Sequence, residues 1–298
     1  MSTIRSDGTG RYYFLQTRGQ WYVLDTLSTP VGVGAVGVVY SGFNYYSRQP
    51  VAIKMVKPEY ANIPFIRDRA KHEAQLTFLH PNIVRMLGVC EFENKYGPIY
   101  LVSEFVNGSN FDAYCRNNFS NMDEGFRISH ILMHSIKILN ALEYVHRAGV
   151  IHRDVKPTNI MVTFDGVPKL MDLGIAGFAN SRDMSQKSFI GTALYAAPEL
   201  INCDVIDNRT DIYAMGVTIF EVLAGYNPFQ AETQDDVLNK QLFENLPEDD
   251  DIHPNLLYIL RNATEKDKMK RYKSAQDFAE DLTWFLKDYA PYSIDFSA

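Results

Sequence analysis

The sequence has few cysteines and no long apolar run. Its 298 residues contain only three cysteines, at positions 90, 115 and 203, and no C-x-x-C pair. An odd number of widely spaced cysteines argues against a disulfide framework or a zinc site and suits a reducing compartment. No stretch approaches the ~18 apolar residues of a membrane helix, and the polar start MSTIRSDGTG is unlike a signal peptide. These absences predict a cytoplasmic protein with no membrane segment in this chain.

Basic residues (29) are outnumbered by acidic ones (36). The net charge is −7 and the isoelectric point is near 5.5, so no basic field favours a nucleic-acid partner. Hydrophobic residues make up 46%, which is typical of a globular protein with one large domain or two smaller ones. The acidic run 247–252 is interpreted as a solvated loop. His130 and His134 lie four residues apart, but without a third ligand nearby they are interpreted as ordinary helix residues.

The chain changes character near residue 107. Before this point, strands are predicted at 11–15, 21–24, 31–56 (a hairpin), 83–92 and 97–106. Residues 1–10 are expected to form a loose tail, and 62–79 a helix with Asn62 as its N-cap. A 3.6-residue apolar period predicts further helices at 111–118, 123–147, 210–225, 234–243, 254–264 and 274–287. Strands followed by helices predict an α+β protein of two lobes.

A glycine motif and a lysine lie in the strand-rich part. Residues 32–39 fit G-x-G-x-x-G-x-V, but they lead into the strand VAIK and not into a helix, which excludes a dinucleotide-binding βαβ unit. Glycines between two strands let backbone amides approach a triphosphate. Lys54 ends the VAIK strand and needs an anion, because an unpaired buried ammonium is costly. The phosphates of ATP and the carboxylate of Glu73 are the candidate partners.

The run GVIHRDVKPTNIMV, which begins at Gly149, crowds polar side chains between apolar flanks. His152, Arg153, Asp154, Lys156 and Asn159 fall within eight residues. The flanks predict short buried strands that position a polar loop, and catalytic groups concentrate on such loops. A solvated turn does not explain so many different polar types in one place.

These motifs together resemble those of eukaryotic-like serine/threonine protein kinases, in wording close to the bacterial members, from about Trp21 to Leu286. H-R-D-x-K-x-x-N is met at 152–159, Asp-Phe-Gly appears as 172–174 with Leu173 for phenylalanine, and Ala-Pro-Glu stands at 197–199. The resemblance implies a bilobal kinase-like fold with a small antiparallel β N-lobe, one main helix in that lobe and a larger helical C-lobe. The implied divisions are an N-terminal extension (1–20), N-lobe (21–106), C-lobe with catalytic loop and activation segment (107–290) and C-terminal tail (291–298).

The resemblance also implies roles for individual residues. Asp154 would orient the substrate hydroxyl, Lys156 would neutralise the phosphoryl group, and Lys54, fixed by Glu73, would position the phosphates. Asn159 and Asp172 would bind Mg²⁺, or Mn²⁺ in its place. The implied nucleotide-contacting residues are Gly32, Val33, Gly34, Ala35, Gly37, Val39, Ala52, Lys54, Ser103 at the gatekeeper position, Glu104, Val106, Asn110 and Met161. Asp211 would support the catalytic loop and Arg271 would pair with Glu199.

Two departures from the family pattern concern the N-lobe. Glu73 lies seven residues before His80, about two fewer than is usual in the family. Either the helix or its following loop is shortened, or the partner of Lys54 is another residue. Residues 9–30 contain extra residues before the glycine motif, and they are interpreted as a strand or arm added to the N-lobe.

The implied activity is transfer of the γ-phosphoryl group of ATP to serine and threonine of protein substrates, with autophosphorylation in the activation loop through self-association. Ser188 is the candidate phosphate acceptor there. A pseudokinase or nucleotide-binding interaction module is the alternative, although such proteins are expected to lose Lys54, Asp154 or Asp172. A small-molecule phosphotransferase is a second alternative, although those usually lack a segment ending in Ala-Pro-Glu.

Overall fold

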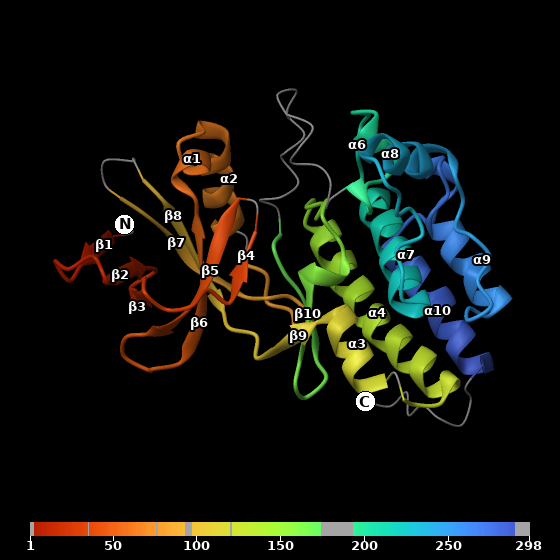
Figure 1. Ribbon diagram of the computed structural model, residues 1–298, viewed down its shortest axis with the longest axis horizontal. Coiled ribbons are helices and arrows are strands. Elements are labelled where there is room, and N and C mark those ends of the chain that lie inside the picture. Colours follow the sequence, from red (N-terminus) through yellow and green to blue (C-terminus); the bar gives the residue numbers. More distant parts are fainter. Residues whose placement is uncertain are drawn as a thin grey trace. The chain divides into compact units, whose positions relative to one another are not determined.

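The computed structural model describes residues 3–34, 36–75, 77–92, 97–119, 121–173 and 193–289, with positions 65, 69 and 72–75 described by their backbone only. The chain divides into two compact units, of which the first ends at Asn107 and the second begins at Gly108 (Figure 1). The first unit contains an antiparallel sheet and the second is mostly helical, which confirms the predicted α+β class.

The sheet of the first unit has the order β1-β2-β3-β5-β6-β8-β7, with β4 paired to β5. Its strands are β1 (Thr3–Ser6), β2 (Tyr12–Thr17), β3 (Gln20–Asp25), β4 (Gly32–Val33), β5 (Gly37–Asn44), β6 (Pro50–Val56), β7 (Met86–Glu91) and β8 (Ile99–Glu104). Alternating side chains from these strands, Leu15, Leu24 and Ile53 among them, are fully buried and form the core of the unit.

Two helices pack beside this sheet. The helix predicted at 62–79 is present as α2 (Pro64–Gln75), which lies next to β7 and β8, and a short helix that was not predicted, α1 (Pro58–Ala61), precedes it (Figure 1). Asn62, predicted as an N-cap, is the C-cap of α1. Proline explains the correction, because Pro58 and Pro64 are each suited to the first turn of a helix, and Pro64 could not continue α1.

The N-terminus is not the loose tail that we predicted. Strand β1 pairs antiparallel with β2, from Thr3 opposite Gln16 to Ser6 opposite Tyr13. The hairpin lies against β7, where the Cys90 thiol donates to the carbonyl oxygen of Gln16 at 3.4 Å. The sequence TIRS has no apolar pattern that would predict a strand. Its place at the edge of the sheet comes from backbone pairing with β2.

We expect Gly88→Ala to destabilise the first unit. Gly88 has φ +154°, and an added Cβ atom would collide with the side chain of Thr17 on β2. Such overpacking costs about 1–3 kcal/mol, so the urea midpoint should fall. The measurement is Trp21 fluorescence in a Trp284→Phe background, because Trp21 and Trp284 are the two tryptophans of the chain.

Gly8→Ala is the matched control for this substitution. Gly8 also has a positive φ, +84°, but an added Cβ meets nothing within 4 Å, so only the backbone cost applies. Equal midpoint shifts in the two variants would contradict the close packing of β2 on β7.

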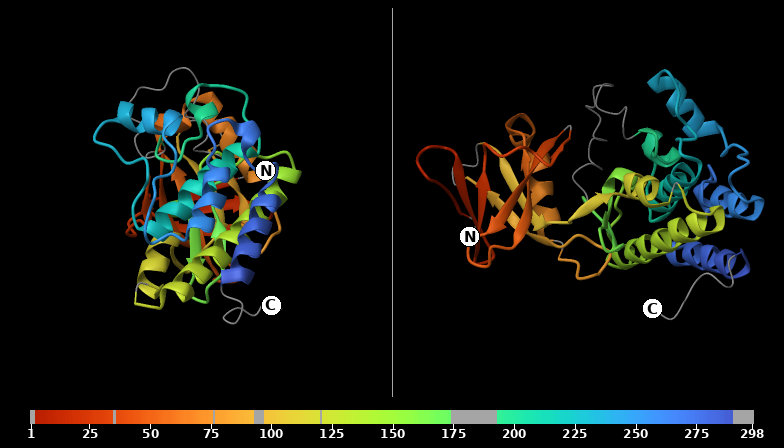
Figure 2. Two further views of the ribbon diagram at one scale, coloured as in Figure 1. Left: turned by 90° about the vertical axis from the view of Figure 1, so that its right-hand side faces the viewer. Right: turned by 60° about the horizontal axis from the view of Figure 1, so that its bottom comes forward.

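The second unit is built around helices and a small sheet of order β11-β10-β9. Its elements are β9 (Gly108–Asn110), α3 (Phe111–Phe119), α4 (Glu124–Arg147), the single-turn η1 (Pro157–Asn159), β10 (Ile160–Thr163), β11 (Pro168–Leu170), α6 (Pro198–Ile201), α7 (Arg209–Ala224), α8 (Gln234–Phe243), α9 (Pro254–Ala263), η4 (Lys268–Lys270) and α10 (Ala275–Tyr289). Almost every residue of α7 is buried, so this helix forms the centre of the unit. Helices α4 and α10 run side by side (Figure 2).

The six predicted helices of this unit are confirmed to within two residues at each end. Of the two strands expected to flank the polar run, β10 is present, whereas residues 150–151 are not a strand. Those residues follow directly after α4 and lead into the polar loop without a neighbouring strand of their own. None of the helices in the described ranges is both long and apolar enough to cross a membrane.

Candidate active site

The polar loop between α4 and β10 fixes one carboxylate from two sides. Asp154 is only 5% exposed, and the Lys156 ammonium contacts its Oδ1 and Oδ2 atoms at 2.9 and 2.8 Å. Pro157 begins the turn η1, which brings Asn159 back toward the same carboxylate. The Asn159 amide nitrogen donates to Oδ2 of Asp154 at 2.7 Å and to its main-chain oxygen at 2.8 Å. Asp154 therefore has a defined orientation next to a positive charge.

A second buried carboxylate, Asp211 in the first turn of α7, supports this loop. It accepts hydrogen bonds from the backbone N–H groups of His152 and Arg153 at 2.8 and 2.7 Å. The His146 Nε2 atom lies 2.7 Å from its Oδ2 atom. Burial alone would raise the pKa of Asp211, but these donors and the charge of His146 hold that pKa below its ordinary value. A negative charge thus positions two consecutive backbone amides of the loop.

His152 joins the loop to the residues before Asp172. Its Nδ1 atom accepts from the backbone N–H of Asp154 at 3.3 Å, so its Nε2 atom is the one that donates, to the Met171 carbonyl at 2.7 Å. The Met171 N–H donates in turn to the carbonyl oxygen of Asn159 at 2.9 Å. Arg153 and Asp172 have φ values of 70° and 54°. Left-handed residues other than glycine cluster at functional sites.

Asn159 and Asp172 suit a hard divalent cation. Both hydrogen bonds recorded for the Asn159 side chain use its nitrogen, which leaves the Oδ1 oxygen as a possible ligand. Because Met171 is hydrogen-bonded to the Asn159 carbonyl oxygen, Asp172, the next residue, lies close to the backbone of Asn159. Mg²⁺ takes oxygen ligands of these kinds, one or two from the protein and the others from phosphates and water.

The predicted nucleotide residues of the first unit lie on adjacent strands. Val39 of β5 is opposite Lys54 of β6, and Ala52 of β6 is opposite Ser103 of β8. Gly37 is needed where β5 and β6 approach, because an added Cβ would lie 2.7 Å from the Met55 carbonyl oxygen. The remaining positions are Gly32 and Val33 on β4, Gly34 in the following turn, Glu104 at the end of β8 and Val106 just after it.

Two of the predicted nucleotide residues lie in the second unit, where Asn110 of β9 is paired with Met161 of β10. Ala35 lies outside the described residues, and so does the side chain of Glu73, although its backbone belongs to α2. The ion pair between Lys54 and Glu73 therefore stays a prediction.

His130 and His134 make contacts within α4 and with neighbouring aromatic rings. His130 stacks on Phe126 with ring centroids 3.8 Å apart, and His134 is buried, which lowers its pKa. In the part of the chain that the structure describes, no three His, Cys, Asp or Glu side chains are grouped as metal ligands.

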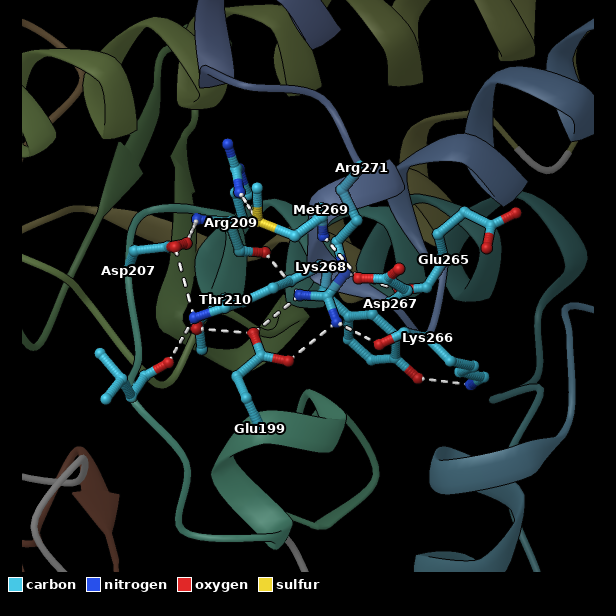
Figure 3. A network of polar contacts seen from close by, with 12 residues as sticks. Glu199, Asp207, Arg209, Thr210, Glu265, Lys266, Asp267, Lys268, Met269 and Arg271 are labelled. Atoms are coloured by element: carbon cyan, nitrogen blue, oxygen red, sulfur yellow. Dashed lines mark hydrogen bonds and ion pairs between the residues drawn. The ribbon is translucent and has the colours of Figure 1, made fainter.

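The end of the candidate activation segment is anchored by a buried ion pair (Figure 3). The Arg271 Nη1 and Nη2 atoms contact Oε1 and Oε2 of Glu199 at 2.7 and 2.8 Å, and the Thr210 hydroxyl donates to Oε1 at 2.8 Å. This is the pairing that the kinase resemblance implied. Burial would raise the pKa of Glu199, but Arg271 outweighs it and the pKa lies below its ordinary value.

Sequence reasoning did not identify His146 as part of the site. Its one local signal is its place in the last turn of α4, where positive charge is favoured. Its partner, Asp211, is 65 residues further along the chain.

Known proteins share this sequence pattern and fold. The family model described as "Protein kinase domain" matches residues 26–284. A probable serine/threonine-protein kinase of Clostridium perfringens is 32% identical over 266 residues, which are 87% of this chain and 38% of that protein. The serine/threonine-protein kinase PrkC of Bacillus subtilis is 31% identical over 261 residues, 85% of this chain and 39% of PrkC. The chain thus spans about two fifths of the length of these relatives.

A solved structure supports the fold. The kinase domain of Mycobacterium tuberculosis PknI, crystallised as a double mutant, matches with a TM-score of 0.65 over 92% of this chain and 96% of that one. The two sequences are 24% identical.

Proposed function

The chain belongs to the protein kinase domain family, and we propose that it transfers the γ-phosphoryl group of ATP to serine and threonine hydroxyls of proteins. The observation that carries this proposal is the Asp154 carboxylate, which Lys156 and Asn159 orient. The relatives that match at about 30% identity are named serine/threonine-protein kinases, and the lysine two residues after Asp154 fits that class. Unlike a typical pseudokinase, the chain also retains Lys54 and Asp172.

Phosphoryl transfer needs alignment and charge neutralisation more than covalent chemistry. We assign to Asp154 the orientation of the acceptor hydroxyl and the acceptance of its proton. Lys156, 2.8 Å from that carboxylate, offsets the negative charge of the transferring group. Asn159 and Asp172 would bind Mg²⁺ or Mn²⁺, and such a cation supplies charge neutralisation at the phosphates when bound. Lys54 and the glycine hairpin between β4 and β5 are assigned to the phosphates.

We also propose activation by autophosphorylation between two copies of the chain, with Ser188 as the acceptor. Residues 174–192, which include Ser188, lie outside the described residues, so this part rests on the sequence. A phosphate there would add nearly two negative charges, and Arg153 is the basic residue proposed to pair with it. Phosphopeptide mapping of active protein should find phosphate on Ser188. Full activity of Ser188→Ala would contradict this assignment.

The choice of acceptor tests the main proposal. ADP release is measured with Mg²⁺ and ATP in the presence of unstructured protein acceptors or, separately, of aminoglycosides and other hydroxyl-bearing small molecules. We expect the protein acceptors alone to stimulate ADP release, and Lys54→Met to abolish the stimulation. Stimulation by small molecules alone would favour a small-molecule phosphotransferase. ATP binding without stimulation by any acceptor would favour a pseudokinase.

A further inference from the structure

A buried glutamine contacts the backbone near the end of the candidate activation segment. Gln241 of α8 is fully buried, and its Nε2 atom donates to the carbonyl oxygens of Leu194 at 2.6 Å and Ala193 at 3.2 Å. These two bonds use both hydrogens of the carboxamide. The contacted residues directly follow Gly191-Thr192 in the sequence and precede Ala-Pro-Glu at 197–199. A side chain from a distant helix thus fixes the position of this backbone.

The orientation of the carboxamide is itself determined by two further side chains. The buried Tyr213 hydroxyl donates to the Oε1 atom of Gln241 and accepts from the Lys266 ammonium at 2.8 Å. Lys266 (labelled in Figure 3) also lies over the rings of Tyr213 and Phe229, with its Nζ atom 5.1 and 4.4 Å from the centroids. Because each donor is matched to an acceptor, rotating the amide by 180° would break the contacts to Tyr213, Ala193 and Leu194. The hydrogen bonds therefore run in one direction, from Lys266 to the backbone.

A second set of contacts reaches the same backbone from another side. The Tyr195 hydroxyl and the Asn227 amide nitrogen each donate to Oε2 of Glu221 at 2.7 Å. The same Asn227 nitrogen lies 3.5 Å from the Leu194 carbonyl oxygen, which Gln241 also contacts. Residues 193–195 are thus fixed by side chains from α7, from α8 and from the loop after α7.

We propose that Gln241, oriented by Tyr213 and Lys266, is a positioning residue for acceptor-protein binding. This extends the proposed kinase activity and rests on it. Residues 193–195 lie shortly before Ala-Pro-Glu at 197–199, which closes the candidate activation segment. A backbone held in place at 193–195 lowers the entropic cost of binding an acceptor protein against it.

Gln241→Met tests the role of these hydrogen bonds with little change in side-chain volume. We expect the KM for a protein acceptor to rise at least ~10-fold, which corresponds to about 1.4 kcal/mol. Hydrolysis of ATP without a protein acceptor should stay within about twofold of wild type, because water needs no binding segment. Gln241→Glu keeps the acceptor for Tyr213 but removes both donors to the backbone. It should raise KM as well, and it provides a second variant if Gln241→Met does not fold.

Thr218→Val is the matched control. Thr218 of α7 is also fully buried, but its hydroxyl donates only within its own helix, to the Ala214 carbonyl at 2.8 Å. A loss of general stability should affect ATP hydrolysis and acceptor phosphorylation equally in this variant. A rise in KM no larger in Gln241→Met than in Thr218→Val, or a parallel loss of ATP hydrolysis, would overturn the positioning role.

Amide hydrogen exchange separates this proposal from the kinase proposal. Peptides covering 193–197 should exchange faster in Gln241→Met than in wild type or Thr218→Val, whether or not a good acceptor is known. Unchanged exchange would reject the contact as a determinant of this segment. Absence of any protein phosphorylation by wild type would instead reject the proposed function.

Discussion

Asp154→Asn is expected to reduce phosphoryl transfer at least ~10³-fold, or about 4 kcal/mol of barrier, while ATP still binds. Asparagine keeps the shape of the side chain but cannot accept the proton of the acceptor hydroxyl. It also removes the negative charge that lies 2.8 Å from the Lys156 ammonium. The measurements are the single-turnover rate at saturating ATP and the dissociation constant for ATP by calorimetry.

Asp250→Asn makes the same chemical change at an exposed position of the acidic run. It should leave both quantities unchanged. A rate for Asp154→Asn within tenfold of wild type would show that another group orients the hydroxyl. A parallel loss of ATP affinity would show that the substitution disturbs more than the transfer step.

Arg271→Met is expected to destabilise the second unit by about 3–5 kcal/mol, because it leaves the Glu199 carboxylate buried without its cation. Both side chains are almost fully buried, at 3% and 5% exposed. Urea unfolding followed by helical circular dichroism reports mainly on this unit, which contains most of the helices in the described ranges. The double variant Glu199→Leu, Arg271→Met should regain much of the loss, since it buries no unpaired charge. A double variant no more stable than Arg271→Met would contradict this explanation.

The same ion pair predicts a pH dependence. Because the pKa of Glu199 is lowered in the folded protein, its contribution is present above the unfolded value of about 4.3 and is lost as the pH falls through the folded value. In Arg271→Met, burial without the cation should raise the pKa of Glu199, so protonation should stabilise the variant as the pH falls. The stability difference between wild type and variant should therefore shrink on acidification from pH 7 to pH 4. A constant difference would mean that Glu199 does not titrate in this range in either protein.

The features predicted correctly from the sequence are those with local signals. The catalytic loop could be identified because Asp154, Lys156 and Asn159 lie within six residues and their contacts are made within the loop. The helices of the second unit could be placed because burial of one face imposes a 3.6-residue period over many residues.

The features that were missed depend on contacts between distant residues. Gln241 is a polar residue in a helix, and its sequence neighbourhood does not show that it contacts a backbone 47 residues earlier. His146 contacts Asp211, which is 65 residues further along the chain. Strand β1 could not be predicted, because its sequence has no apolar alternation and its position at the edge of the sheet is set by pairing with β2.

Phosphoamino-acid analysis of a protein acceptor labelled from γ-³²P-ATP tests the central claim most directly. We predict label on serine and threonine, accumulating over many turnovers with wild type and Mg²⁺, and at background level with Asp154→Asn. Label confined to tyrosine, or equal label with wild type and Asp154→Asn, would contradict the account of a serine/threonine kinase centred on Asp154.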